Sequence, residues 1–168
     1  MKRLTEKRIL NITLFYLSRY ESSIAKVRAM LHRRLLRLKA QGLDVPPAAE
    51  EWIEHAIQTA VAHSYLNDDR YAENQVRRLV AEGRSEHYIT AKLAMAGIDS
   101  DTTHRLLEAT GSTEADRANR FVRRKRLGPY RPESERTARY AKDLAALARA
   151  GFSYEVADQA LRTPPPTD

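Results

Sequence analysis

Apolar residues recur every three or four positions along most of the chain, which is the spacing of one face of an α-helix. The first clear stripe begins after Ser22 or Ser23, either of which can cap a helix, and ends at Gly42. Pro46 and Pro47 then precede a second stripe, where the first turn of a helix tolerates proline. No segment alternates apolar and polar residues as a strand does. The pattern predicts an all-α protein.

A charged segment in the middle of the chain, SYLNDDRYAENQVRRLVAEGRS, has the signals of a helix start and a helix stop. Asn67 or Asp68 can cap the helix, because the side-chain oxygen accepts a backbone N–H that otherwise lacks a partner. Gly83 ends the helix, and Arg77 and Arg78 fall outside its apolar stripe. The acidic residues are therefore interpreted as a helix start and not as catalytic groups.

The rest of the chain follows the same plan of caps, apolar stripes and glycine stops. A short irregular segment, GPYRP, separates two of the later helices. Helix starts are predicted at Ser85, Ser100 and Thr113, stops at Gly97 and Gly151, and a last short helix ends at Leu161.

Two sequence motifs occur more than once, which indicates an internal repeat. VRR at 76–78 matches VRR at 122–124, and LAMAGI at 93–98 matches LARAGF at 147–152. LKAQGL at 38–43 is a weaker copy of the second motif. Small helical units bury their apolar faces poorly alone, so they stack on their neighbours. The predicted divisions are an extension of the first helix at 1–10, three three-helix repeats at 11–66, 67–111 and 112–162, and a disordered tail at 163–168.

Composition narrows the classes of protein. The chain has 168 residues and no cysteine, which excludes disulfides, thiolate metal sites and a cysteine nucleophile. The N-terminal apolar run is interrupted by Asn11 and Thr13, and no stretch reaches the roughly 20 apolar residues of a membrane span. We expect a protein without membrane contact, and the absence of cysteine fits the cytoplasm.

Charge is distributed unevenly along the chain, whose net charge is +7. Residues 1–42 hold 11 basic and 2 acidic side chains, residues 43–112 hold 6 and 12, and residues 113–142 hold 10 and 4. Basic ends with an acidic middle suit a polyanion, or a protein whose surface alternates in sign. An unevenly charged solvent surface is the alternative.

No arrangement of residues indicates an enzyme. The five histidines are scattered, and Glu51 with His55, one helical turn apart, lacks a third metal ligand. No glycine-rich phosphate loop or nucleophile motif is present, so no cofactor and no metal are expected. A helix-turn-helix around Gly97 is disfavoured, because Leu93 and Thr103 stand where that motif needs a small and an apolar residue.

Arginine-rich helix faces are the candidate binding sites. Arginine recognises carboxylates and phosphates with two parallel hydrogen bonds, which lysine cannot do. The alternative is a charged face that contributes only solubility. Arg117 lies on the same predicted helix as the arginines at 120–126, and Lys26 on the same predicted helix as those at 33–37. The candidates for contact with a partner or DNA are Arg77, Arg78, Arg84, Arg120, Arg123, Arg124, Lys125, Arg126, Arg33, Arg34 and Arg37.

These motifs resemble the RecX family, bacterial regulators of the RecA recombinase. YLNDDRYAENQV is similar to its LxDxRFA-type signature, and AEGRSEHYITAKLAMAGI resembles the segment that follows. RYESS and RAGFSYEVADQAL resemble elements of its first and last repeats. The resemblance spans about residues 11–162.

The resemblance implies three tandem three-helix repeats in an elongated, curved array. It also implies a non-enzymatic protein of DNA repair and recombination that binds the RecA filament on single-stranded DNA. Such a protein restrains strand exchange and ATP hydrolysis, and we expect it to act as a monomer. Two competing hypotheses are a general nucleic-acid-binding protein that acts without RecA, and a structural adaptor that binds neither.

Overall fold

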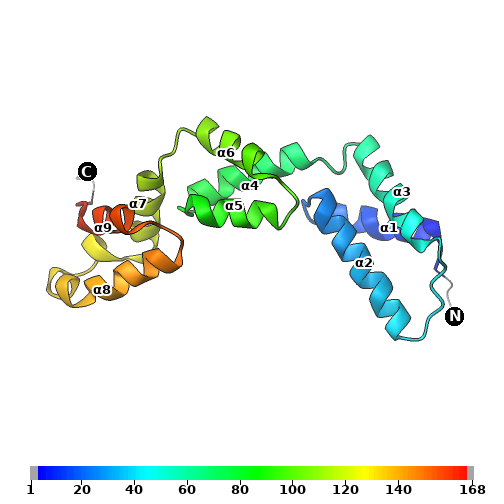
Figure 1. The fold of residues 1–168 in the computed structure, drawn as a ribbon, viewed down its shortest axis with the longest axis horizontal. Coiled ribbons are helices and arrows are strands. Elements are labelled where there is room, and N and C mark those ends of the chain that lie inside the picture. The colour runs from blue at the N-terminus through cyan, green and yellow to red at the C-terminus, as the bar shows by residue number, and fades with distance from the viewer. Residues whose placement is uncertain (1–3, 166–168) are drawn as a thin grey trace. The chain divides into compact units, whose positions relative to one another are not determined.

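The computed structural model describes residues 4–165, which contain only helices and the segments that join them (Figure 1). The prediction of an all-α fold is confirmed, since these residues contain no strand. The helices are α1 Glu6–Leu17, α2 Ile24–Ala40, α3 Ala49–Ala62, α4 Asp68–Ala81, α5 Glu86–Ala94, α6 Ser100–Ala109, α7 Glu114–Lys125, the 3₁₀ helix η1 Gly128–Tyr130, α8 Glu133–Arg149 and α9 Tyr154–Arg162.

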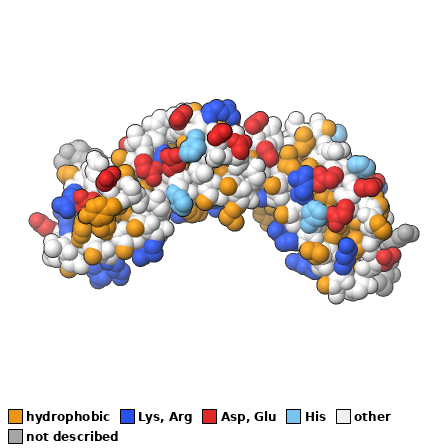
Figure 2. Space-filling view, viewed as in Figure 1, with side chains coloured by type: hydrophobic (Ala, Val, Ile, Leu, Met, Phe, Trp, Pro, Cys, Tyr) orange, Lys and Arg blue, Asp and Glu red, His pale blue; other side chains and the backbone are white. Residues whose placement is uncertain are grey.

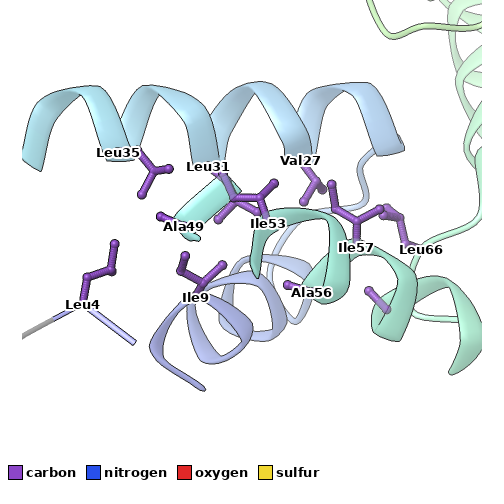
Figure 3. Packing of buried hydrophobic residues seen from close by; sticks show 11 residues of the cluster. Leu4, Ile9, Val27, Leu31, Leu35, Ala49, Ile53, Ala56, Ile57 and Leu66 are labelled. Carbon is purple, nitrogen blue, oxygen red and sulfur yellow. The ribbon is translucent and has the colours of Figure 1, made fainter. Parts of the chain in front are cut away.

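The chain forms two compact units, the first of which ends at Tyr71. In this unit α1, α2 and α3 enclose one apolar core. Figure 3 shows side chains of α2 pointing toward α3 and α1. Val27 and Ile53 are completely buried there, and Ile9 is nearly so. Burying each such side chain contributes roughly 1.5–3 kcal/mol, so the periodic apolar positions hold these three helices together.

The second unit begins at Ala72 and holds the rest of α4 and all later elements. Its C-terminal core lies between α7, α8 and α9, with Leu147 fully buried. The rings of Phe121 and Phe152 meet edge to face, with centroids 5.7 Å apart. That geometry is favoured for aromatic pairs. The aromatic residue of the LARAGF motif therefore ties the end of α8 to α7.

The predicted helix caps are present at the expected positions. The side chains of Ser23, Ser85 and Thr113 each accept a backbone N–H from the first turn of α2, α5 and α7. Between the two candidates for α4, the cap is Asn67, whose Oδ1 accepts the N–H of Arg70 at 2.8 Å. The short-range signals in the sequence thus locate the helix starts.

The prolines before α3 lie outside the helix and not in its first turn. Pro46 O accepts the N–H of Ala49 at 3.0 Å, which forms a turn ahead of the helix. The first helical residue is Ala49, and no side chain caps this end. The prolines therefore shape the entry to α3.

The glycine stops share one geometry. Gly42, Gly97 and Gly151 have φ of +75°, +80° and +92°, the left-handed conformation that glycine adopts without strain. At each stop, the residue after the glycine donates its N–H to a leucine carbonyl earlier in the helix, over 3.0 to 3.2 Å. This is the Schellman pattern of helix ends. The three copies of the second sequence motif therefore end α2, α5 and α8 in the same way.

Two further sequence expectations concern the chain ends and the membrane. Within residues 4–165, no helix is both long enough and apolar enough to cross a bilayer. Residues 1–3 of the predicted extension and residues 166–168 of the predicted disordered tail lie outside the described residues.

Candidate protein or nucleic-acid interface

The turn between α4 and α5 lies directly against α7. Gly83 in this turn has φ +67°. A Cβ on Gly83 would lie 2.7 Å from both Arg117 O and Phe121 N, closer than real Cβ contacts come. Because a residue without a side chain permits this approach, the neighbours of Gly83 in the sequence are held beside α7.

Three arginines converge on the carboxylate of Glu82. Arg84 Nε lies 3.2 Å from Glu82 Oε2, and Arg78 Nη1 lies 3.5 Å from Glu82 Oε1. Arg124 Nη1 on α7 lies 4.0 Å from Glu82 Oε2. Arg78 also donates to Gln75 Oε1 at 2.7 Å. We call Arg78, Arg84 and Arg124 the arginine cluster, in which three positive charges share one carboxylate.

Two aromatic rings lie beneath the cluster. The guanidinium carbon of Arg84 is 4.7 Å from the ring centroid of Tyr88, and Lys92 Nζ is 5.7 Å from the same centroid. The guanidinium carbon of Arg124 is 5.7 Å from the ring centroid of Phe121. Such cation–π contacts are worth about 0.5–1 kcal/mol at exposed sites. The rings therefore stabilise the positive charges through their faces, and the N–H donors of the cations stay available for other partners.

The arginine cluster differs from arginines that are fully paired within the fold. Arg28 donates twice to Glu54, at 2.7 and 2.8 Å, and Arg131 donates twice to the buried Asp143 at the same distances. A guanidinium has five N–H donors, and charge-assisted bonds are usually about 2.7–2.9 Å long. The contacts to Glu82 are longer, so the cluster retains donors for an outside carboxylate or phosphate.

The paired arginines also shift the pKa of their carboxylates. The hydrogen bonds from Arg28 lower the pKa of Glu54 below its ordinary value. Burial alone raises the pKa of Asp143, but donation from Arg131 and from the Gly128 N–H outweighs it and lowers that pKa. Both carboxylates are therefore charged at neutral pH and serve the fold.

Two basic residues that the sequence placed on outer faces have structural roles. The side chain of Arg117 is 3% exposed, donates to the Glu114 carboxylate, and lies 3.5 Å from Glu86. Its assignment to the exposed face of α7 is wrong, because its guanidinium donates to Ser112 O and Glu114 and is buried between these partners and Glu86. Lys26 Nζ donates to the Tyr71 hydroxyl at 2.7 Å.

The other candidates lie outside the cluster. Arg77 and Arg120 line a groove between α4, α6 and α7. Arg123, Lys125 and Arg126 are exposed at the end of α7. The candidates on α2 belong to the first unit, and all three are exposed: Arg33, Arg34 and Arg37. On the face shown in Figure 2, basic and acidic side chains are interspersed on the surface of each unit.

A groove of about 660 Å³ opens on the second unit between α4, α6 and α7. We call it the α4–α7 groove. Val76 and Val80 of α4 and Leu106 of α6 supply apolar surface, while Arg77 and Arg120 supply positive charge. The structure thus places Arg77 and Arg120 in the groove and separates them from the arginine cluster, while Arg123, Lys125 and Arg126 belong to neither site.

The candidate metal pair does not gain a third ligand. His55 Nδ1 lies 2.9 Å from a carboxylate oxygen of Glu6 in α1, and both side chains are more than half exposed. Among the described residues, no three histidine, aspartate or glutamate side chains are grouped to hold a metal ion.

Glu82, Tyr88 and Lys92 belong to the site although no sequence motif marks them. Tyr88 and Lys92 lie one turn apart on α5, and the sequence shows this spacing. Arg84 precedes the helix, so its contact with Tyr88 depends on the turn. The convergence of Arg124 on Glu82 could not be read from the sequence, because it depends on the packing of α7 against the turn.

Comparison with known proteins gives relatives of one kind. No protein-family model matches the chain. The chain is 35% identical over 159 residues to the regulatory protein RecX of Myxococcus xanthus, with 92% of this chain and 84% of that protein covered. It is 34% identical over 114 residues to the regulatory protein RecX of Agrobacterium fabrum, with 67% and 61% covered. The crystal structure of RecX from Lactobacillus salivarius matches with a TM-score of 0.58 and 21% identity, covering 94% of each chain.

Proposed function

Because the chain belongs to the family of RecX regulatory proteins, we propose that it regulates the RecA recombinase, mainly as an inhibitor. It binds the groove of the RecA filament on single-stranded DNA and restrains strand exchange and ATP hydrolysis. The action is stoichiometric and not enzymatic, and the protein acts as a monomer in the cytoplasm. Bound along the filament, it bridges neighbouring RecA protomers, hinders the motions that hydrolysis needs and blocks the entry of a second duplex.

The observation that carries this proposal is the arginine cluster. Arg78, Arg84 and Arg124 share the single carboxylate of Glu82, at 3.2 to 4.0 Å. Their remaining donors suit carboxylates on a protein surface or exposed phosphates, and a filament of protein on DNA offers both. The exposed Arg123, Lys125 and Arg126 extend the same positive surface.

The proposed domain organisation is three tandem three-helix repeats. The recurrence of the leucine-to-glycine helix stop at the ends of α2, α5 and α8 supports the repeats at 11–66, 67–111 and 112–162. Repeats of one design offer similar contacts at regular intervals. This organisation suits a filament whose protomers also recur at regular intervals.

One observation favours a second function, binding to nucleic acid without RecA. The Tyr88 ring lies beside Arg84 and Lys92, and proteins that bind single strands combine aromatic platforms with positive charge. In that case, binding to naked single-stranded DNA depends steeply on salt and gains nothing from RecA.

The test is the DNA-dependent ATP hydrolysis of cognate RecA, measured while this protein is titrated at fixed salt. Inhibition that requires near-equimolar protein supports occupancy along the filament. Inhibition far below one copy per RecA protomer indicates capping of growing ends instead. No effect at any ratio, with the protein folded, contradicts the proposed function and favours the nucleic-acid-binding alternative.

A further inference from the structure

One wall of the α4–α7 groove is a single face of α4. Glu73, Val76, Arg77 and Val80 recur at three- and four-residue steps, so they lie side by side along the helix. Val76 and Val80 are almost fully buried at the base of this face, and Leu106 of α6 is half-buried opposite. The apolar surface that the groove leaves open therefore comes mainly from Leu106 and from the exposed Ala81 and Ala109, with Val76 and Val80 packed behind it.

Charge differs between the two ends of the groove. Arg120 Nη1 donates to Val80 O at 3.1 Å, which fixes its guanidinium at the C-terminal end of α4. Arg77 lies one turn before Val80, and its nearest hydrogen-bond partner, Asn74 Oδ1, is 3.5 Å away. Glu73 lies seven residues before Val80, roughly 10 Å along the helix at about 1.5 Å per residue. Arg77 thus stands near the middle of this face, roughly 6 Å along the helix from Glu73, and Arg120 stands at its C-terminal end, so positive charge covers the C-terminal half of the groove.

We propose that the α4–α7 groove binds a segment of the partner protein that combines an aliphatic side chain with a carboxylate. The aliphatic group packs on Leu106, Ala81 and Ala109, and the carboxylate takes the remaining donors of Arg77 and Arg120. Glu73 repels a reversed segment, so the charges set its direction. This inference rests on the proposed function, because the partner that supplies the segment is RecA in its filament.

The lining of the groove favours a polypeptide over nucleic acid. Bases of single strands bind by stacking on aromatic rings. The described residues that line the groove include no aromatic side chain, whereas the Arg84–Tyr88 face elsewhere on the unit does. Aliphatic surface next to guanidiniums matches a protein side chain next to an acidic residue.

The test fills the groove without touching the buried Val76 and Val80. Ala109, the last residue of α6, lines the groove and is exposed, so Ala109→Trp adds bulk there. Ala141→Trp, at an exposed position of α8, is the matched control. Binding of each variant to cognate RecA filaments and to naked single-stranded DNA is measured, after circular dichroism has confirmed equal helicity. We expect Ala109→Trp to weaken filament binding about tenfold and to leave binding to naked DNA unchanged.

Equal filament binding by Ala109→Trp and Ala141→Trp overturns the inference. Equal weakening of filament and naked-DNA binding by Ala109→Trp also overturns it, because the groove then takes nucleic acid. If Ala109→Trp does not fold, Ala81→Trp, at an exposed position of the groove on α4, replaces it under the same criteria.

The triple variant R78A/R84A/R124A separates this inference from the proposed function. If the triple variant loses filament binding and Ala109→Trp binds normally, the inference about the groove is wrong and the proposed function stands. If the wild-type protein does not bind the filament, both the proposed function and the inference about the groove are wrong.

Discussion

Arg124 Nη1 on α7 lies 4.0 Å from Glu82 Oε2, one residue after α4, and this ion pair joins the second VRR motif to the turn that follows the first. At that distance the pair is an electrostatic contact and not a hydrogen bond. Glu82 also faces Arg78 and Arg84, so it partly neutralises the cluster that we propose binds the filament. Glu82 therefore competes with any carboxylate or phosphate that approaches from outside.

Replacing Glu82 with Gln should tighten binding to RecA filaments. The substitution removes the internal competitor but keeps the shape of the side chain, and we expect a gain of about 1 kcal/mol, or roughly fivefold in affinity. Titrations at several salt concentrations measure it, and the gain should shrink as salt rises. Glu155→Gln, at an exposed position of α9, makes the same charge change away from the cluster. Weaker binding by the Glu82 variant would mean that Glu82 orients the arginines instead.

Replacing Gly83 with Ala should destabilise the second unit more than the same change at Gly111. Both glycines have positive φ, +67° and +65°, so both substitutions introduce left-handed strain of roughly 1–2 kcal/mol. At Gly83 the new Cβ also meets backbone atoms at 2.7 Å, whereas nothing lies within 4 Å at Gly111. Denaturant unfolding compares the two free energies. Equal losses of unfolding free energy in the two variants would show that α7 moves away from the turn at no energetic cost.

The local features of this fold could be read from the sequence, and its long-range contacts could not. The sequence predicts Thr113 as a helix start and narrows the start of α2 to Ser22 or Ser23, of which Ser23 is the cap, because a cap and its partner N–H lie within one turn. Arg117 and Arg124 lie on one helix, and the sequence grouped them together. Packing distinguishes them, because the Arg117 side chain is buried against Glu114 and Glu86 whereas Arg124 stays about one-third exposed.

Replacing Arg117 with Ala should lower stability, in contrast to Arg124→Ala. Arg117 is buried, but its partners Glu114 and Glu86 are partly exposed, so its removal should cost about 1–3 kcal/mol. Arg124 is about one-third exposed, and its removal should cost less than about 1 kcal/mol. Thermal or urea unfolding distinguishes the two. A stable Arg117→Ala protein would contradict the structural role of this residue.

The pair between Arg131 and Asp143 should make stability depend on acid pH. The pKa of Asp143 is lowered in the folded protein, so its contribution is present above the unfolded pKa of about 3.9 and is lost as pH falls through the lower folded value. Asp143→Asn should therefore cost about 3 kcal/mol at pH 7, and the difference from wild type should narrow in strong acid. Urea unfolding at pH 7 and in acid measures this. Asp101→Asn, at an exposed site, should show no such change, and a pH-independent loss in Asp143→Asn would contradict the account.

The most direct test of the central claim is the affinity of R78A/R84A/R124A for cognate RecA filaments on single-stranded DNA. The control R105A/R139A/R149A removes the same charge from three exposed arginines of the same unit. We predict that the cluster variant binds at least about tenfold more weakly than the control, with unchanged helicity. Equal affinity of the two variants would contradict the assignment of the arginine cluster as the filament-binding site.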